Sequence, residues 1–152
     1  MARPPSQARE PRALPSFLSS LSPDPRRLAA LRDRLEDGIL RSVTGTALNG
    51  VKSPRVPNTT NISFDRTEAE SLLIALDLEG IAVSTGSACS SGTLEPSHVL
   101  RAMGLPTHRT QNSIRFSLGA SNTTEQVDHV VSIMPRIVAK LRSLSAVGAV
   151  RR

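Results

Sequence analysis

Residues 81–105 read IAVSTGSACSSGTLEPSHVLRAMGL, and they include Cys89, the only cysteine of the chain. The β-branched character of the first three residues predicts a short strand. The next ten residues are mostly small and polar and include two glycines, which predicts an exposed, mobile loop. Pro96 and Ser97 are typical of a helix start, and Gly104 is typical of a helix end. The stretch thus predicts a strand, a loop that carries a thiol, and a short helix.

Two helices are predicted upstream of this stretch, because their apolar residues recur at spacings of three and four. The first covers residues 26–41, and Asp24 is placed to be its N-cap. The second is expected to start at a capping box formed by Thr67 and Glu70 and to end near Gly80.

Three strands and a last helix complete the predicted elements. Alternating or β-branched residues predict strands at 43–48, 59–64 and 113–118. The last helix is expected to start at Thr123 or Thr124 and to bend at Pro135.

The order of these elements, α-β-β-α-β-α-β-α, predicts an α+β fold with two layers, a sandwich in which helices cover one face of the sheet. Six of the eleven prolines lie in residues 1–25, which predicts a disordered, proline-rich lead-in. We therefore predict one domain over residues 26–145, followed by a basic tail over residues 146–152.

Composition argues against several classes of protein. No run approaches the roughly 20 apolar residues that span a bilayer, so no membrane segment is expected. The net charge of +6 comes from the ends, because residues 1–42 carry +3, residues 43–135 carry −2 and residues 136–152 carry +5. With only three aromatic residues as well, the chain is not expected to bind nucleic acid. A single cysteine cannot form an intrachain disulfide, which fits a reducing cytoplasm.

Four motifs in one order along the chain point to a known family. They are NG at 49–50 with RVPNT at 55–59 and NISF at 61–64; GSACSSG at 86–92; PSHVL at 96–100 with MG at 103–104; and SIRFSLG at 113–119. Together they closely resemble the C-terminal part of the pyridoxal-phosphate-dependent cysteine desulfurases, within the class V aminotransferases. The resemblance implies the small C-terminal domain of a fold-type I pyridoxal-phosphate enzyme.

Cys89 is the first candidate site residue. Its polar, glycine-rich surroundings are unusual, because cysteines that serve only in packing are mostly buried. By resemblance, Cys89 attacks the sulfur of cofactor-bound L-cysteine, which leaves a persulfide on Cys89 and releases L-alanine. The resemblance further implies a homodimer and transfer of the sulfur to an iron–sulfur scaffold or other acceptor protein, with Cys89 as a shared ligand of the iron–sulfur cluster. The alternative from the residues alone is a cysteine buried under the following helix.

Arg115 is the second candidate site residue. Its strand alternates, and Arg115 falls on the side predicted to be polar and solvated, together with Ser113 and Ser117. On this pattern alone, a surface arginine is an equally good interpretation. In the family that the chain resembles, the arginine of SIRFSLG binds the α-carboxylate of the substrate. A guanidinium suits this role because it can bind a carboxylate through two parallel hydrogen bonds.

Pyridoxal phosphate, the cofactor that the resemblance implies, needs a lysine for its Schiff base. The chain has only Lys52, in a loop beside prolines, and Lys140, on the last helix, and neither stands in the family's S-x-H-K context. The chain alone is therefore expected to be inactive and not to hold the cofactor.

The remaining polar residues give weaker indications. The histidines and Cys89 fit none of the structural zinc spacings, so the histidines are expected to be ordinary surface residues. These histidines are His98, His108 and His129. Asn58 and Asn61 are expected to support turns and strand ends rather than to bind substrate.

Two other interpretations stay open on the sequence. One is a selenocysteine lyase or another class V aminotransferase domain, which could share the fold without transferring sulfur. The other is a non-catalytic module that carries a thiol, as a sulfur acceptor or an interaction domain. A persulfide formed on Cys89 from L-cysteine would distinguish the desulfurase from both.

Overall fold

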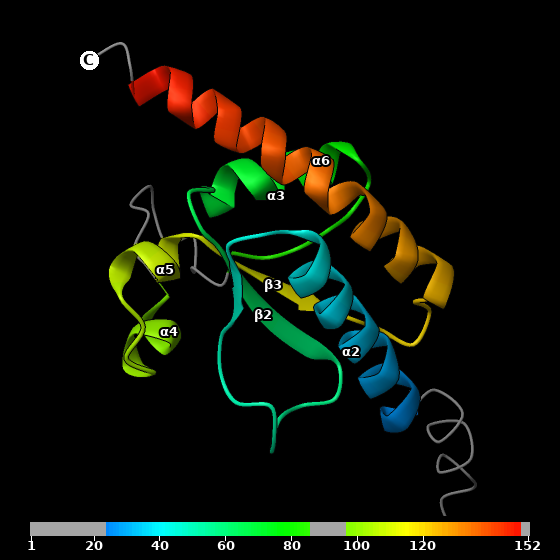
Figure 1. Cartoon of the computed structure of the whole chain (residues 1–152). Helices are drawn as coiled ribbons and strands as arrows, with labels where there is room; N and C mark the ends of the chain where they lie inside the picture. The colour runs from blue at the N-terminus through cyan, green and yellow to red at the C-terminus, as the bar shows by residue number, and fades with distance from the viewer. Residues whose placement is uncertain (1–23, 86–96, 150–152) are drawn as a thin grey trace, which may run out of the picture.

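The computed structural model describes residues 24–85 and 97–149, with 147–149 described by their backbone alone (Figure 1). The helices are α2 (Pro25–Ser42), α3 (Ala69–Leu78), α4 (His98–Ala102), α5 (Thr107–Gln111) and α6 (Thr124–Ala149). The strands are β1 (Thr46–Leu48), β2 (Thr59–Phe64) and β3 (Ser113–Ser117). The fold is therefore α+β, as predicted.

The strands form one antiparallel sheet in the order β1-β2-β3. In its register, Ile62 of β2 lies opposite Leu48 of β1 and Ile114 of β3. An isolated bridge between Ser84 and Arg115 continues the pairing beyond β3. Because directly opposite residues of antiparallel strands share a face, this register separates an apolar face from a polar one.

The apolar face of the sheet forms one half of the core. Ile62 and Phe64 of β2 and Ile114 of β3 are fully buried there, and Phe116 is nearly so. The aliphatic faces of α2, α3 and α6 supply the other half (Figure 1). Removing this apolar surface from water, at about 25 cal/mol per Å², is the main term that stabilises the fold. The opposite, polar face of the sheet stays free of these three helices.

α2 and α6 pack against each other outside the sheet. A Cβ atom on Gly38 of α2 would lie 2.6 Å from Cγ2 of Val131 of α6, well inside the 3.5–4.0 Å of a favourable carbon–carbon contact. Arg34 and Asp128 add an exposed ion pair between the same helices, with Nε and Oδ1 2.6 Å apart. The packing of the two helices therefore requires glycine at position 38.

Several predicted elements are confirmed. α2 covers the first predicted helix, and Oδ1 of Asp24 accepts a hydrogen bond from the backbone N–H of Arg26 at 2.9 Å, as an N-cap should. β2 has the predicted bounds, and α6 begins at Thr124. Gly80 follows α3 with a φ of +77°, the left-handed conformation expected of a helix-ending glycine.

The strand predicted at 81–83 is wrong. The backbone N–H of Ile81 donates to the carbonyl of Leu76 at 2.9 Å and so completes the end of α3. Pairing with β3 is limited to the bridge at Ser84. The segment contains β-branched residues, but its first hydrogen bond caps α3 instead of pairing with a strand.

The capping box predicted for the second helix is also wrong. Oγ1 of Thr67 donates to the carbonyl of Asp65 at 3.3 Å instead of accepting from the helix. Glu68 occupies the N-cap position of α3, but its side chain accepts from the hydroxyl of Ser71 at 3.2 Å and caps no backbone N–H of the helix. The helix itself forms because Leu72 and Leu76 are buried in the core.

Other boundaries differ from the prediction. β1 begins only at Thr46, because Val43 ends α2 and Gly45 turns the chain with a φ of +69°. The short α5 was not predicted. α6 extends to Ala149, so helix continues into the predicted tail at 146–152.

Some predictions remain untested. α6 continues on both sides of Pro135, and a bend there stays a prediction. The lead-in predicted for residues 1–25 lies outside the described residues except for its last two. Within 24–85 and 97–149, none of the helices combines the length and apolar character needed to cross a bilayer.

Candidate functional site

Cys89 lies in residues 86–96, outside the described residues, so its exposure and role stay predictions. The structure does describe the residues on both sides of this segment. After it, Ser97 caps α4, with Oγ accepting from the backbone N–H of Leu100 at 3.5 Å, and Gly104 follows the helix with a φ of +80°. Before it, Ser84 is held against β3.

Arg115 is the point on β3 to which the chain before Cys89 is attached. The backbone N–H of Arg115 donates to the carbonyl of Ser84 at 2.6 Å, and the N–H of Ser84 donates to the carbonyl of Arg115 at 3.1 Å. Ser84 is five residues before Cys89 in sequence. The structure therefore brings the start of the Cys89 segment next to Arg115, the other predicted site residue.

Arg115 also belongs to a line of residues that crosses the sheet. Asn61 lies opposite Arg115 on β2, and the backbone N–H of Asn49 donates to the carbonyl of Asn61 at 2.8 Å. Asn49, Asn61, Arg115 and Ser84 thus lie side by side on the polar face, because opposite residues share a face. We call these four residues the transverse row.

A hydrogen-bond network orders the transverse row at its Asn49 end. Nδ2 of Asn49 donates to Oδ1 of Asn61 and to Oγ of Ser113, each at 2.8 Å. Oγ of Ser113 in turn donates to the carbonyl of Arg109 in α5 at 2.6 Å. Arg109 reaches back to Oγ of Ser63 and to the carbonyl of Leu48. These bonds fix the Asn49 and Asn61 side chains relative to the sheet.

Ser113 corrects one detail of the prediction. The alternation placed it on a solvated face with Arg115, but Ser113 is fully buried, whereas Arg115 and Ser117 are exposed. α5, the helix that the sequence did not predict, lies next to Ser113 and removes it from water. The polar face is therefore covered at one end and open at Arg115.

Sequence reasoning missed the roles of Asn49 and Asn61. The sequence contains Asn49 only as part of the NG motif and predicts for Asn61 only a supporting role at turns and strand ends. Pairing NISF with SIRFSLG places Asn61 beside Arg115, and pairing the segment that ends at Asn49 with NISF places Asn49 on the other side of Asn61. That step requires the register between strands, which local patterns do not give.

Arg115 differs from Arg32 and Arg55, which are buried or partly buried and pair with carboxylates. Within residues 24–85 and 97–149, Arg115 forms no ion pair, because every ion pair found there joins other residues. A guanidinium that has no carboxylate partner of its own is able to bind the carboxylate of a ligand. The arrangement fits the role predicted for Arg115.

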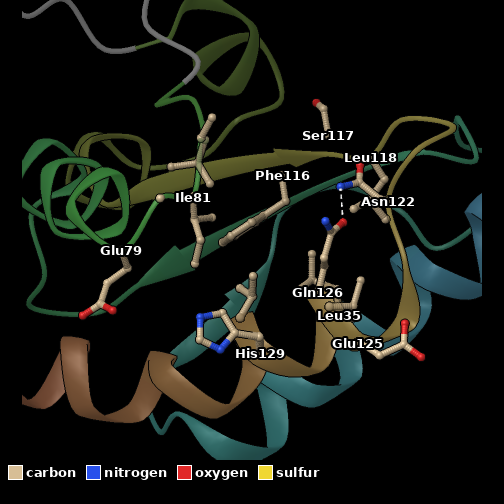
Figure 2. Close-up of a pocket in the computed structure, with 15 residues that line it drawn as sticks. Leu35, Glu79, Ile81, Phe116, Ser117, Leu118, Asn122, Glu125, Gln126 and His129 are labelled. Atoms are coloured by element: carbon tan, nitrogen blue, oxygen red, sulfur yellow. Dashed lines mark hydrogen bonds between the residues drawn. The ribbon is translucent and has the colours of Figure 1, made fainter.

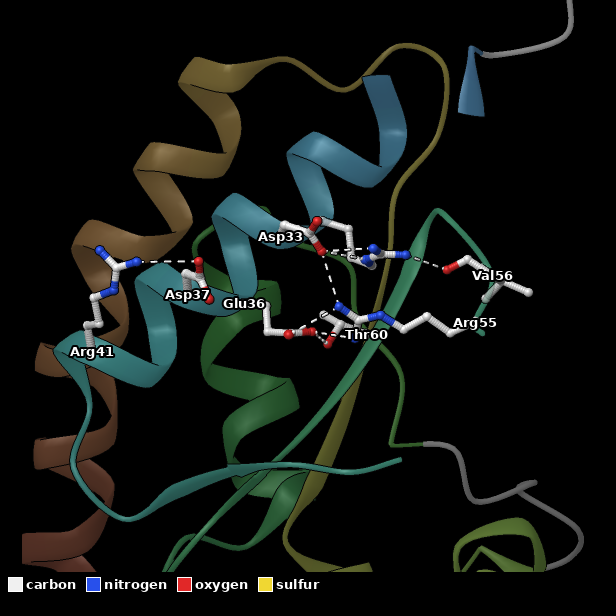
Figure 3. Close-up of polar contacts among 8 residues, drawn as sticks. Asp33, Glu36, Asp37, Arg41, Arg55, Val56 and Thr60 are labelled. Carbon is white, nitrogen blue, oxygen red and sulfur yellow. Dashed lines mark hydrogen bonds and ion pairs between the residues drawn. The ribbon is translucent and has the colours of Figure 1, made fainter. Parts of the chain in front are cut away.

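Arg55 represents the opposite case (Figure 3). Its Nη1 lies 2.7 Å from Oε2 of Glu36, and its Nη2 lies 3.1 Å from Oδ1 of Asp33. Thr60 donates to the same Oε2 of Glu36 at 2.6 Å. Burial raises the pKa of the Glu36 carboxyl, but the hydrogen bonds from Arg55 and Thr60 and the charge of Arg55 together lower it by more, so its pKa lies below the usual 4.5. This cluster fastens the 49–58 loop to α2.

A cavity lies elsewhere among the described residues (Figure 2). It has a volume of about 590 Å³, is partly open to solvent, and is lined by residues 79–83, the end of β3 and the first turns of α6. Phe116 and Ile81 contribute apolar surface, and His129 extends into it from α6. Arg115 is not among the lining residues, so the cavity is separate from the transverse row. It forms where 81–83 do not pair with β3.

The described residues do not fit pyridoxal phosphate by themselves. Lys52 and Lys140 are both exposed. Lys140 lies on α6, which packs on the face of the sheet opposite to Arg115. A Schiff-base lysine has to meet the substrate that Arg115 would bind. In the described part of the chain, there is also no cluster of histidine, cysteine, aspartate and glutamate that could hold a metal ion.

Comparison with known proteins identifies similar chains. The family model for the class-V aminotransferases matches residues 21–130. A cysteine desulfurase of Trichormus azollae is 53% identical over 115 residues, which are 76% of this chain and 29% of that protein. Cysteine desulfurase IscS of Methanosarcina thermophila is 50% identical over 120 residues, which are 79% of this chain and 30% of that protein. The chain thus spans about 30% of the length of these relatives.

Solved structures agree with the sequence comparison. A NifS-like protein superimposes with a TM-score of 0.66 at 28% identity, covering 83% of this chain and 30% of that one. A NifS-like protein from Rickettsia africae gives a TM-score of 0.64 at 30% identity, covering 75% of this chain and 29% of that one. A putative sugar aminotransferase of Streptococcus pneumoniae shares the fold, with a TM-score of 0.58 at 16% identity.

Proposed function

Because this chain belongs to the aminotransferase class-V family, we propose that it is the part of a cysteine desulfurase that binds the carboxylate of L-cysteine and receives its sulfur. The observation that supports this most directly is Arg115: it is exposed, has no ion-pair partner among the described residues, and is bonded to the chain that leads to Cys89. We propose L-cysteine as the substrate because the relatives are named cysteine desulfurases.

In this proposal, Arg115 holds the substrate by its carboxylate, and the Cys89 thiolate attacks the substrate sulfur. A sulfur–sulfur bond forms as the carbon–sulfur bond of the substrate breaks, and the carbon keeps the electron pair and takes up a proton. L-cysteine and the Cys89 thiol thus become L-alanine and a Cys89 persulfide, with no external oxidant or reductant. Pyridoxal phosphate, the cofactor of this family, would be held by residues beyond those described here.

The proposal has consequences for partners and architecture. The α+β unit would be the two-layer small domain of a fold-type I enzyme, in which the helices α2, α3 and α6 form one layer. The complete enzyme would be a homodimer that passes sulfur to an iron–sulfur scaffold or another acceptor protein, with Cys89 available as a shared cluster ligand. Cys89 has to be a free thiol to act as the nucleophile, and cysteines are kept reduced in the cytoplasm, so this is the compartment we propose.

A chimera tests this function. Residues 26–145 would replace the matching segment of the Trichormus azollae desulfurase, and L-alanine and protein-bound persulfide would be measured with L-cysteine as substrate. We expect both products, with the persulfide on Cys89 and absent from the Cys89→Ala variant. Alanine without persulfide would favour a selenocysteine lyase or another class V enzyme. Neither product, from a folded chimera that holds the cofactor, would favour the non-catalytic module.

A further inference from the structure

We propose that Asn61 supplies a second hydrogen-bond donor, beside the Arg115 guanidinium, for the carboxylate of the substrate, and that Asn49 is the positioning residue that sets the direction of the Asn61 amide. This inference rests on the proposed function. Neither the sequence motifs nor the names of the relatives give these two residues a role in substrate binding. It follows from the register of the sheet and from the direction of each hydrogen bond in the transverse row.

The register places the Asn61 and Arg115 side chains close together. The N–H of Phe64 donates to the carbonyl of Asn112, and the N–H of Leu118 donates to the carbonyl of Asn58. In an antiparallel ladder every second pair is hydrogen-bonded. Counting inward from these two pairs, Asn61 and Arg115 form a pair of the non-hydrogen-bonded kind. In such a pair the Cα atoms are about 4.5 Å apart and the side chains are closest. The backbone of Arg115 accordingly turns away from β2, toward Ser84.

The direction of the hydrogen bonds leaves Asn61 with an outward donor. Ser113 gives its single hydroxyl proton to the carbonyl of Arg109, so it must accept from Asn49. The second proton of the Asn49 amide goes to Oδ1 of Asn61. Oδ1 of Asn61 thus faces Asn49, and the Nδ2 group of Asn61 points away from Asn49 with two protons to donate.

Burial of Asn49 makes the opposite direction unfavourable. Asn49 is only 8% exposed, and its Oδ1 has no partner within the described residues. If both amides were turned over, Asn49 would have two unpaired N–H groups in place of one unpaired carbonyl. Each buried donor without a partner costs about 1–3 kcal/mol. The observed direction is therefore the more stable one.

Two neighbouring groups that only donate can share an acceptor placed between them. The Arg115 guanidinium has no acceptor atom, and the outward Nδ2 of Asn61 has none either. A carboxylate provides two oxygens, each able to accept, and its negative charge matches the charge on Arg115. The pair is complementary to a carboxylate, whereas an ammonium or a thiol of the same substrate would find no acceptor there.

Carboxylate titration of the 152-residue chain, followed by NMR of the side-chain N–H groups, tests the inference without cofactor or turnover. Sodium acetate is the probe, and sodium chloride at the same ionic strength is the control. We expect the Nδ2 protons of Asn61 and the Nε proton of Arg115 to shift with acetate along one binding curve. Acetate that moves the Arg115 signal and leaves Asn61 in place would overturn the proposal, and so would a titration that moves neither.

Matched variants separate binding from folding. Asn61→Asp keeps the size of the side chain and the acceptor toward Asn49 but replaces the outward donor by an oxygen, and we expect acetate binding to be lost. Asn61→Ala should weaken it about tenfold, as expected for one hydrogen bond to a charged group. Thr59→Ala, two residues away on the same face, should bind acetate like the parent chain. Equal affinity in parent and Asn61→Asp would contradict the inference.

The chimera distinguishes this inference from the proposed function. Asn61→Ala and Asn49→Ala should each raise KM for L-cysteine, by about tenfold for Asn61, with little change in kcat. With cysteamine, which lacks the carboxylate, neither variant should change the rate. An active chimera whose KM is unaffected by Asn61→Ala would refute the inference alone. An inactive chimera would refute the proposed function, and the acetate titration would still decide the role of Asn61.

Discussion

Arg55 and Arg115 carry the same side chain in two different settings, one in the 49–58 loop and one on β3. Arg55 is only 15% exposed at its side chain and is paired with Glu36 and Asp33. Arg115 is exposed, and its neighbour across the strands is a neutral amide that cannot neutralise it. A guanidinium with carboxylate partners contributes to stability, while one left beside donors remains able to bind. Substitution of Arg55 should therefore lower stability, whereas substitution of Arg115 should lower substrate binding and leave stability nearly unchanged.

The largest effect on stability is expected from Arg55→Ala. Removing Arg55 leaves the Glu36 carboxylate buried, with only 3% of its side chain exposed. Breaking a buried pair in this way costs about 3–5 kcal/mol. Urea unfolding of the 152-residue chain, followed by circular dichroism, measures this loss.

Arg41→Ala is the matched control for that experiment. Arg41 pairs with Asp37 on the same helix, but both side chains are exposed (Figure 3). An exposed pair of this spacing contributes about 0.3–0.5 kcal/mol. If Arg55→Ala cost no more than Arg41→Ala, the difference we draw between paired and binding arginines would have no basis.

The next effect concerns activity rather than stability. Arg115→Gln in the chimera should lower kcat/KM for L-cysteine at least about thirtyfold, because loss of a charged partner for a carboxylate costs about 2–5 kcal/mol. In the 152-residue chain, the same substitution should change the unfolding free energy by less than about 0.5 kcal/mol, as at other exposed positions. A destabilisation as large as that of Arg55→Ala would show that Arg115 is a structural residue.

A smaller loss of stability is expected in the hydrogen-bond network around Ser113 on the polar face. Ser113→Ala removes the acceptor of Asn49 and the donor to Arg109 in a fully buried place. The unfolding free energy should fall by about 1–3 kcal/mol. Acetate binding should weaken as well, because Asn49 then loses one of the two bonds that direct it. Destabilisation without any change in acetate binding would separate the network from the binding site.

The smallest effect is a pH dependence of the unfolding free energy that comes from Glu36, the partner of Arg55. The pKa of Glu36 is lowered in the folded chain, so the unfolded chain binds its proton more readily. The stability that Glu36 contributes is thus complete above its unfolded pKa, near 4.5, and is lost as the pH falls through the folded value. Urea unfolding at pH 7, 5 and 3.5 should show this loss in the parent chain and a smaller one in Glu36→Gln. Identical pH profiles would contradict it.

The sequence predicted those elements whose pattern is long or whose ends are marked. Asp24 and the apolar spacing of 26–41 define α2, and the alternation of NISF defines β2. α5 was missed because five residues are too short to show a helical period. The error at 81–83 has a different cause: β-branched residues favour an extended chain, but whether that chain pairs depends on the partner that tertiary structure places beside it.

The sequence likewise predicted one part of the candidate site and missed the rest. The motifs predicted Arg115 as a site residue, which stays a prediction, and their order identified the family. Ser84, Asn49 and Asn61 join Arg115 only through the register of separate segments, up to 66 residues apart from Asn49 to Arg115. No local pattern contains that information, which is why the transverse row could be recognised only in three dimensions.

The bridge between Ser84 and Arg115 also bears on aggregation. Exposed strand edges can pair with the edge of another molecule, and proteins avoid this with short strands, charges and interruptions. β1, at one edge of this sheet, has only three residues. At the other edge, Ser84 already occupies the backbone groups at the centre of β3, and the Arg115 charge lies at the same place. A second chain that added a strand to β3 would have to displace Ser84 first, so the contact that leads toward Cys89 also makes this edge a poor template for assembly.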